Sequence, residues 1–200
     1  MMMRILLPFI CAVTTVTTAY AADVARSVDA SQFDVSGVKL GMTRSEAVAT
    51  ATAKLKIDKQ SVEFDKFPQV NQVTKSKEPQ YFIATNGSGK LTVYFYPKIP
   101  TDKSNPMLVG LVKYEMPWTL ENAQSMKAAA LEKYGQPSNG TVGASYEWCS
   151  KPSKNVGEGC FEFKGPKLAL SGVSIELTDP TYQTAVIDFI NKSQSSKPAF

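Results

Sequence analysis

The chain has 200 residues, a net charge of +4 from 22 Lys and Arg against 18 Asp and Glu, and three cysteines but no histidine. The absence of histidine excludes the Ser–His and Cys–His pairs of nucleophilic enzymes, and the two thiolates outside the predicted signal peptide alone make an incomplete zinc shell. The basic residues are scattered, without the stripe that is typical of a nucleic-acid surface. We therefore expect no metal, no other cofactor and no nucleic-acid partner.

Residues 1–21 have the pattern of a secretory signal peptide. Arg4 supplies the positive n-region, residues 5–16 are apolar, and Ala19-Tyr20-Ala21 matches an A-x-A cleavage site. The apolar run is too short to predict a membrane span, and the residues before Cys11 do not resemble those of a lipoprotein signal. We expect a bacterial protein that is cleaved after Ala21, periplasmic or secreted, with no transmembrane segment.

A short extended segment and a sharp turn precede the first predicted helix. Apolar residues alternate there with small or polar ones, namely Val38, Leu40 and Met42. Gly41 permits the turn, and Thr43 with Glu46 forms a capping box, in which side chain and backbone of the two residues exchange hydrogen bonds. Met42 and Ala47 have the spacing of a hydrophobic staple. This pattern predicts a helix that begins after Thr43 and runs to about Lys56.

Strands are predicted in the rest of the first half. One strand is predicted over 61–67, and a longer strand is predicted over Met107–Glu115. Between them, 80–85 and 90–96 flank the turn Asn86-Gly-Ser-Gly89, which predicts a β-hairpin.

The second half repeats the helix start. Trp118 precedes the predicted N-cap Thr119 as Met42 precedes Thr43, and Ala123 is its expected staple partner. The two caps lie 76 positions apart. A helix is predicted over 120–134, followed by Gly135. Strands are predicted near 142–149, 160–164 and 168–177. A last helix is predicted to begin at Pro180, after Asp179, and a loose tail is predicted at 193–200. The fold class is therefore α+β, with two tandem helix-plus-antiparallel-sheet modules, 33–116 and 117–192, the second including the C-terminal helix.

Cys149 and Cys160 are the two cysteines that remain after export. Ten residues separate them, and an oxidising compartment favours a disulfide that closes a long loop between strands. Such a loop predicts about 2–3 kcal/mol of stabilisation. A redox-active pair is the alternative, although the CxxC spacing is absent.

The segment Gly37-Val-Lys-Leu-Gly-Met-Thr-x-x-Glu46 resembles the start of modules in the BamE/SmpA and β-lactamase-inhibitor-protein-like superfamily. The later Lys133-Tyr-Gly-x-Pro137, followed by an aromatic strand with Trp148, is similar to what such modules show after their helix. The resemblance implies small exported α+β modules with helices on an antiparallel sheet, sometimes in tandem. It covers 33–115, with a second copy expected after it.

The strand 90–96 contains the candidate binding residues. If Leu91, Val93 and Phe95 form its apolar face, then the residues that face the other way are Thr92, Tyr94 and Tyr96. Tyrosine combines a large contact area with a polar group, which is typical of interaction surfaces. The alternatives are a sheet that is covered on both sides and tyrosines that are scattered surface aromatics.

Glu147 and Glu162 are the candidate catalytic residues. Both fall on predicted strands next to the cysteines with the same parity, so they could share a sheet face, as a carboxylate-based hydrolase requires. By the same pairing, Tyr146 and Trp148 would pack against the phenylalanines of 160–164.

The function that these observations favour is a periplasmic binding or accessory protein. Its partner would be another envelope or secreted protein, contacted across an antiparallel sheet face without catalysis. The alternatives are a hydrolase acting on envelope polymers and a structural envelope component without a specific ligand.

Overall fold

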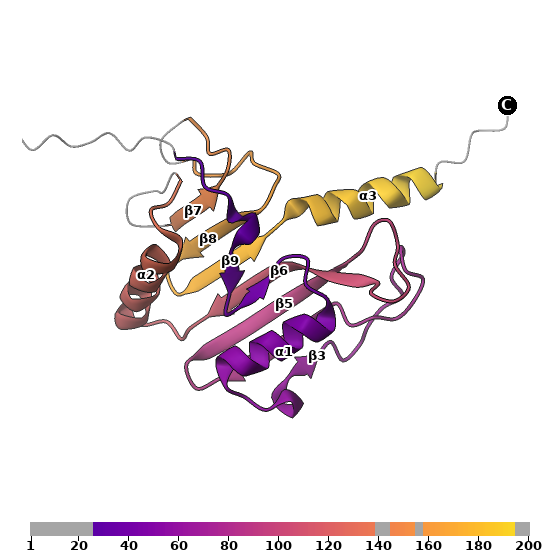
Figure 1. Ribbon diagram of the computed structural model, residues 1–200, viewed down its shortest axis with the longest axis horizontal. Helices are drawn as coiled ribbons and strands as arrows, with labels where there is room; N and C mark the ends of the chain where they lie inside the picture. Colours follow the sequence, from indigo (N-terminus) through magenta and orange to yellow (C-terminus); the bar gives the residue numbers. More distant parts are fainter. Residues whose placement is uncertain (1–25, 139–144, 155–157, 195–200) are drawn as a thin grey trace, which may run out of the picture.

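The computed structural model describes residues 26–138, 145–154 and 158–194. These residues form a two-layer α+β structure, with two helices on one face of a seven-stranded antiparallel sheet and a third helix at one end (Figure 1). The elements in chain order are η1 (Ala30–Gln32), β1 (Asp34–Val35), β2 (Val38–Lys39), α1 (Arg44–Leu55), η2 (Lys59–Ser61), β3 (Glu63–Phe64), β4 (Tyr81–Asn86), β5 (Gly89–Pro97), β6 (Met107–Glu115), α2 (Leu120–Tyr134), β7 (Ser145–Cys149), β8 (Lys167–Ser171), β9 (Ser174–Thr178) and α3 (Pro180–Gln194).

Across the large sheet the strands follow the order of the chain as far as β6, and beyond β6 they follow the reverse order. The full order is β3-β4-β5-β6-β9-β8-β7, and every neighbouring pair is antiparallel. The first half of the chain contributes β3 to β6 and the second contributes β7 to β9. Because β6 pairs with β9, the two halves share one continuous sheet.

Two apolar rows cross this sheet beneath the helices. In the first row each residue is the cross-strand partner of the next and all are 0% exposed: Phe82, Val93, Val112, Leu177, Leu168 and Trp148. The second row runs beside it: Ala84, Leu91, Tyr114, Ile175, Leu170 and Tyr146. A slip of one residue in any strand would turn its part of both rows to the other face, so the rows hold the register.

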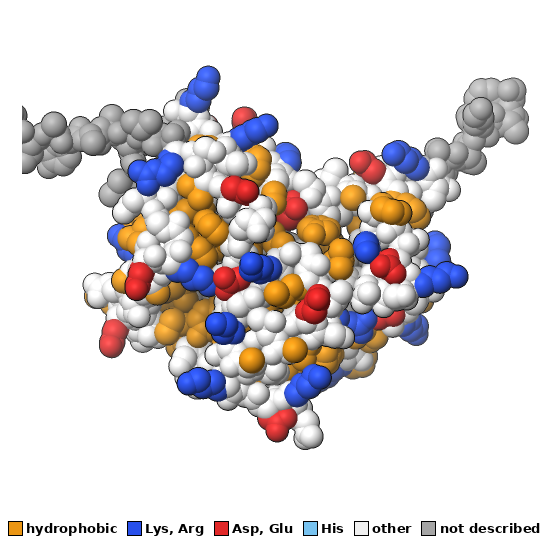
Figure 2. All heavy atoms as spheres, in the orientation of Figure 1, with side chains coloured by type: hydrophobic (Ala, Val, Ile, Leu, Met, Phe, Trp, Pro, Cys, Tyr) orange, Lys and Arg blue, Asp and Glu red, His pale blue; other side chains and the backbone are white. Residues whose placement is uncertain are grey.

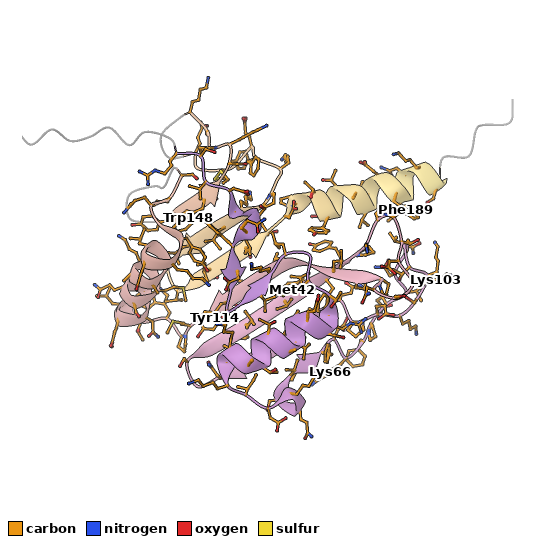
Figure 3. The ribbon with its side chains drawn as sticks, viewed as in Figure 1. Met42, Lys66, Lys103, Tyr114, Trp148 and Phe189 are labelled. Atoms are coloured by element: carbon orange, nitrogen blue, oxygen red, sulfur yellow. A yellow bond between two sulfur atoms is a disulfide. The ribbon has the colours of Figure 1, made fainter. Side chains whose placement is uncertain are left out.

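The helices and the β1–β2 hairpin cover these rows. α1 packs along β4, β5 and β6, α2 lies over the second half of the sheet, and the hairpin lies between the two helices (Figure 1). The residues that this layer buries are Ala47, Val48 and Ala51 of α1, Val35 and Val38 of the hairpin, and Met126 and Ala130 of α2. Figure 3 shows Trp148 and Tyr114 on the part of the sheet next to α2.

The predicted capping box at the start of α1 is present. The Thr43 side chain accepts from the Glu46 N–H, and the Glu46 carboxylate accepts from the Thr43 N–H. Gly41 has a φ of 78°, in the region that favours glycine. Its N–H donates to the Val109 carbonyl, and the Val109 N–H donates to the Met42 carbonyl. The start of α1 is therefore hydrogen-bonded to β6.

Three predicted strands differ in the structure. The strand expected at 168–177 is two antiparallel strands, β8 and β9, with a turn between them at 172–173. The strand expected at 61–67 is reduced to the two residues of β3, and the one expected at 160–164 is a turn in which Phe161 is 80% exposed. The expected packing of its phenylalanines against Trp148 is wrong, because β7 pairs with β8 and places Leu168 opposite Trp148.

The predicted disulfide between Cys149 and Cys160 is present, and both residues are fully buried. It joins the end of β7 to the turn that precedes β8. The Glu147 carboxylate accepts a hydrogen bond from the Cys160 N–H and supports the same turn.

The two later helices follow their predicted start signals. α2 covers the predicted range 120–134, and Gly135 follows it with a φ of 75°. α3 begins at Pro180, after Asp179, and it reaches two residues into the tail predicted at 193–200. The rest of that tail and the predicted signal peptide lie outside the described residues. Within the described part of the chain, no helix is long and apolar enough to cross a membrane.

Candidate functional site

The face of the sheet opposite α1 and α2 is the candidate site, and we call it the open face. Its residues alternate with those of the two apolar rows, and the strand register arranges them in three rows of cross-strand partners. These are Tyr81, Tyr94, Leu111, Thr178 and Lys167; Ile83, Thr92, Lys113, Glu176 and Ala169; and Thr85, Lys90, Glu115, Ser174 and Ser171. An antiparallel sheet that is covered on one face leaves the other available for contacts.

Tyrosines dominate one corner of the open face. Tyr81 and Tyr94 are direct cross-strand partners, and their ring centroids lie 5.7 Å apart at an angle of 49°. Tyr94 is 40% exposed. Ile83 and Leu111 lie beside the pair and are half-buried. The corner therefore presents a contiguous apolar and aromatic surface that carries phenolic hydroxyls.

Tyr96 has a different role from Tyr94. Gly110 is the extra residue of a β-bulge in β6, opposite Tyr94 and Phe95. A Cβ atom on Gly110 would lie only 2.3 Å from a ring carbon of Tyr96, so this ring lies directly over the glycine. Tyr182 of α3 stacks on Tyr96 with 6.4 Å between ring centroids. Tyr96 thus holds α3 at the end of the open face, and partial burial raises the pKa of its hydroxyl.

Thr92 is the most buried of the three predicted binding residues, with 6% of its surface exposed. Its cross-strand partners Ile83 and Lys113 have longer side chains and flank it on both sides. Thr92 therefore supports the open face and offers little contact area of its own.

Charged side chains form a neutral group in the middle of the open face. Glu115 lies 2.9 Å from the Lys113 ammonium and 3.3 Å from that of Lys90, and Lys113 is the cross-strand partner of Glu176. The hydrogen bond from Lys113, followed by Lys90, holds the pKa of the Glu115 carboxyl below its usual value, although partial burial opposes this. The same hydrogen bond raises the pKa of Lys113. The four charges sum to zero, so they provide no attraction for a polyanion.

The outer edge of β7 is closed to an added strand. The Val28 N–H donates to the Cys149 carbonyl at 2.8 Å, and the Ser138 N–H donates to the Glu147 carbonyl at 2.7 Å. The Ser138 hydroxyl also donates to the Cys149 carbonyl and accepts from the Cys149 N–H, each at 2.9 Å. At the opposite edge β3 has only two residues. Short or covered edges disfavour pairing with another chain.

The two candidate catalytic carboxylates are not arranged as a pair of strand residues. Glu147 lies on β7 and its carboxylate bonds the Cys160 N–H, whereas Glu162 is exposed on a turn. The strand that was to place Glu162 beside Glu147 does not form. Among the described residues, no group of three or more His, Cys, Asp or Glu could hold a metal ion.

The residues predicted at the helix starts have mainly structural contacts. The Thr119 hydroxyl accepts from the Asn122 N–H at 3.0 Å and caps α2. Trp118 is 77% exposed, so the staple expected between it and Ala123 is wrong. The segment before Thr119 is therefore not packed as the segment before Thr43 is.

Sequence reasoning missed Tyr81 as a member of the site. The signal was present, because Tyr81 and Ile83 alternate with Phe82 and Ala84 on the predicted strand 80–85. What the sequence lacked was the register that places Tyr81 opposite Tyr94.

The fold and this site define the class: a two-layer α+β protein with one open, tyrosine-bearing sheet face. Comparison with protein-family models, with curated proteins and with solved structures finds no match for the chain.

Proposed function

We propose that the chain is an exported, periplasmic or secreted binding protein that contacts another envelope or secreted protein through the open face, without catalysis. The observation that carries this proposal is the Tyr81–Tyr94 pair on a face whose central charges sum to zero. Aromatic residues with a polar group are enriched in protein interfaces, and charged residues are depleted at interface cores. A neutral tyrosine corner suits a polypeptide better than nucleic acid.

The partner would be held by side chains of the open face. An extended peptide that adds a strand needs a free sheet edge. The outer edge of β7 is hydrogen-bonded to Val28 and Ser138, and β3 is short. Contact across the face avoids both edges.

Export is supported by the signal-peptide pattern of residues 1–21 and by the Cys149–Cys160 disulfide. Disulfides persist in oxidising compartments such as the periplasm.

We further propose that the two halves, 33–116 and 117–192, are tandem related modules, as the resemblance to the BamE/SmpA and β-lactamase-inhibitor-protein-like superfamily implies. In each half a helix precedes three consecutive antiparallel strands of the sheet, β4-β5-β6 after α1 and β7-β8-β9 after α2, and the first half adds the two-residue edge strand β3. The sheet order β4-β5-β6-β9-β8-β7 is the order that a two-fold relation between such halves gives. The last strand of each half meets the other at the centre.

The test is a double variant of the open face, Tyr81→Ala with Tyr94→Ala, compared with Phe67→Ala. Phe67 is 81% exposed but is not among the open-face residues, so it controls for the loss of an exposed aromatic ring. A photo-crosslinking residue at position 94 in the intact periplasm would identify the partner, whose affinity for purified variants is then measured. A hot spot of about 2 kcal/mol predicts about 30-fold weaker binding of the double variant.

Phe67→Ala is expected to bind as the wild type does. If the double variant folded normally and kept the affinity of the wild type for every captured protein, the open face would not be the binding site.

A further inference from the structure

A second surface lies on the helix-covered side, between α2 and the β1–β2 hairpin, and we call it the α2 groove. It is a cavity of about 180 Å³ that is open to solvent. Its apolar lining comes from the hairpin, from α2, and from the sheet with the residue that follows β6: Val35, Tyr114, Met116, Met126, Tyr134 and Ile175. Figure 2 shows hydrophobic side chains gathered beside α2, with Lys or Arg side chains between them and the hairpin.

The groove exists because α2 covers the sheet less completely than α1 does. α2 buries only Met126 and Ala130 among its 15 residues. Ser125 and Ala129 lie on the same side of α2 and line the groove, and their side chains are too short to fill it. Protein interiors are otherwise close-packed, and an unfilled apolar space forgoes contacts. The groove is thus ready to receive an apolar group.

Positive charge borders the groove. Lys133 lines the groove, and its ammonium donates to the Asp34 carboxylate at 2.6 Å and to the Asp34 carbonyl at 2.9 Å. Lys39 also contributes positive charge at Asp34, and the Lys54 side chain lies against Gly37 in the turn of the same hairpin. Two lysines, Lys133 and Lys39, therefore act on one carboxylate, which leaves a net positive border.

The state of Asp34 agrees with this charge balance. Partial burial alone would raise the pKa of its carboxyl, but the hydrogen bond and charge of Lys133, with the Gly37 N–H, hold it below its usual value. Asp34 is thus ionised at neutral pH and neutralises one lysine only. The remaining positive charge favours an acidic group on whatever enters the groove.

The size of the groove limits its occupant. Pockets that enclose a whole small-molecule ligand usually measure about 300–1,000 Å³. A cavity of about 150 Å³ holds a group of the size of benzene. The α2 groove, at about 180 Å³, therefore fits one aliphatic or aromatic side chain.

We propose that the α2 groove binds one apolar side chain of a partner polypeptide, with a neighbouring acidic residue of that partner placed at the Lys133 border. The apolar lining and the volume select the side chain, and the lysines select the acidic neighbour. The groove lies on the opposite side of the sheet from the open face. The inference therefore does not depend on the function proposed for that face.

The test uses short probe peptides and the mature protein with methyl-labelled methionine. The probes are acetylated, amidated dipeptides: Leu-Glu, Leu-Gln and Ser-Glu. We expect Leu-Glu to shift the NMR signals of Met116 and Met126 saturably and to leave Met107, at the far end of β6, unchanged. Leu-Gln should bind about threefold more weakly at low salt, as the loss of one exposed ion pair predicts. Ser-Glu should produce no saturable shift.

Two matched variants of α2 locate the site. Ala129→Phe fills the groove. Ala128→Phe places the same side chain at the preceding position of α2, which does not line the groove. We expect Ala129→Phe to abolish the Leu-Glu shifts and Ala128→Phe to keep them. Thermal melting of both variants establishes that they fold, and Ser125→Leu is a second blocking variant should Ala129→Phe not fold.

Three results would overturn the proposal. One is the absence of a saturable Leu-Glu shift in the wild type up to the solubility limit of the peptide. Another is a shift that persists in a folded blocking variant. The third is binding of free 4-methylpentanoate as tight as that of Leu-Glu, which would make the groove a site for a small carboxylate and not for a polypeptide.

Discussion

At the scale of single residues, the two tryptophans have opposite environments. Trp148 is fully buried at the end of the first apolar row, and its indole N–H donates to the Gly135 carbonyl at 3.1 Å. Trp118 is 77% exposed. We expect Trp148→Ala to lower the free energy of unfolding by about 3–5 kcal/mol, as for other large core truncations. Trp118→Ala should change it by about 0.5 kcal/mol or less. Urea unfolding followed by far-UV circular dichroism measures both.

Trp148→Phe separates packing from hydrogen bonding, because it keeps an aromatic ring and removes the N–H donor. The free energy of unfolding of Trp148→Phe should lie between those of the wild type and Trp148→Ala. Equal effects of alanine at positions 148 and 118 would contradict the placement of the two indoles.

The three residues predicted on the outward side of β5 show what residue-level patterns can and cannot establish. Alternation separates them from Leu91, Val93 and Phe95, which the structure buries. It could not establish how accessible each one is. Thr92 is covered by its cross-strand neighbours, and Tyr96 lies on Gly110 beneath Tyr182. Those contacts join β5 to β6 and to a helix 86 positions later in the chain, so no local pattern contains them.

At the scale of elements, the Cys149–Cys160 disulfide holds the long connection between β7 and β8. Reduction leaves the folded contacts in place but frees the unfolded chain, which should lower the free energy of unfolding by about 2–3 kcal/mol. Thermal melts of the protein from residue 22 onward, with and without a reductant that does not absorb in the far ultraviolet, measure this. The control is the Cys149→Ala/Cys160→Ala variant, whose melting temperature should not respond to the reductant.

A reductant that left the wild-type melting temperature unchanged, although a non-reducing gel showed the bond to be broken, would contradict this stabilising role. Equal responses of the wild type and the double variant would assign the effect to the reductant itself.

Elements with local start and stop signals were predictable from the sequence. The predicted ranges of α2 and β6 agree with the structure to the residue. Thr119 and Gly135 mark the two ends of α2, and prolines precede and follow β6. The segment 160–164 was not predictable. Its alternation of Phe161, Glu162 and Phe163 imitates a strand, but the disulfide and the Glu147 hydrogen bond hold it as a turn.

At the scale of the whole molecule, the continuous sheet determines how the two halves behave. Val112 of the first half and Leu177 of the second are cross-strand partners and are fully buried. If the halves separated, β6 would expose a long unpaired edge and both apolar rows would be cut. Tandem origin and independent folding are therefore different questions, and the structure bears on the second.

We expect the protein from residue 22 onward to unfold in one cooperative transition. Hydrogen exchange followed by mass spectrometry at increasing denaturant should give the same opening free energy for the amides of 91–95 in β5 and for those of 168–171 in β8 and 174–177 in β9, since these strands carry the rows that cross the centre. Val93→Ala in the first half and Leu168→Ala in the second, both fully buried sites, should each lower that free energy in both halves, by about 1–4 kcal/mol. Two modules that folded independently would show the loss only in the half that carries the substitution, because contacts in the other half would persist.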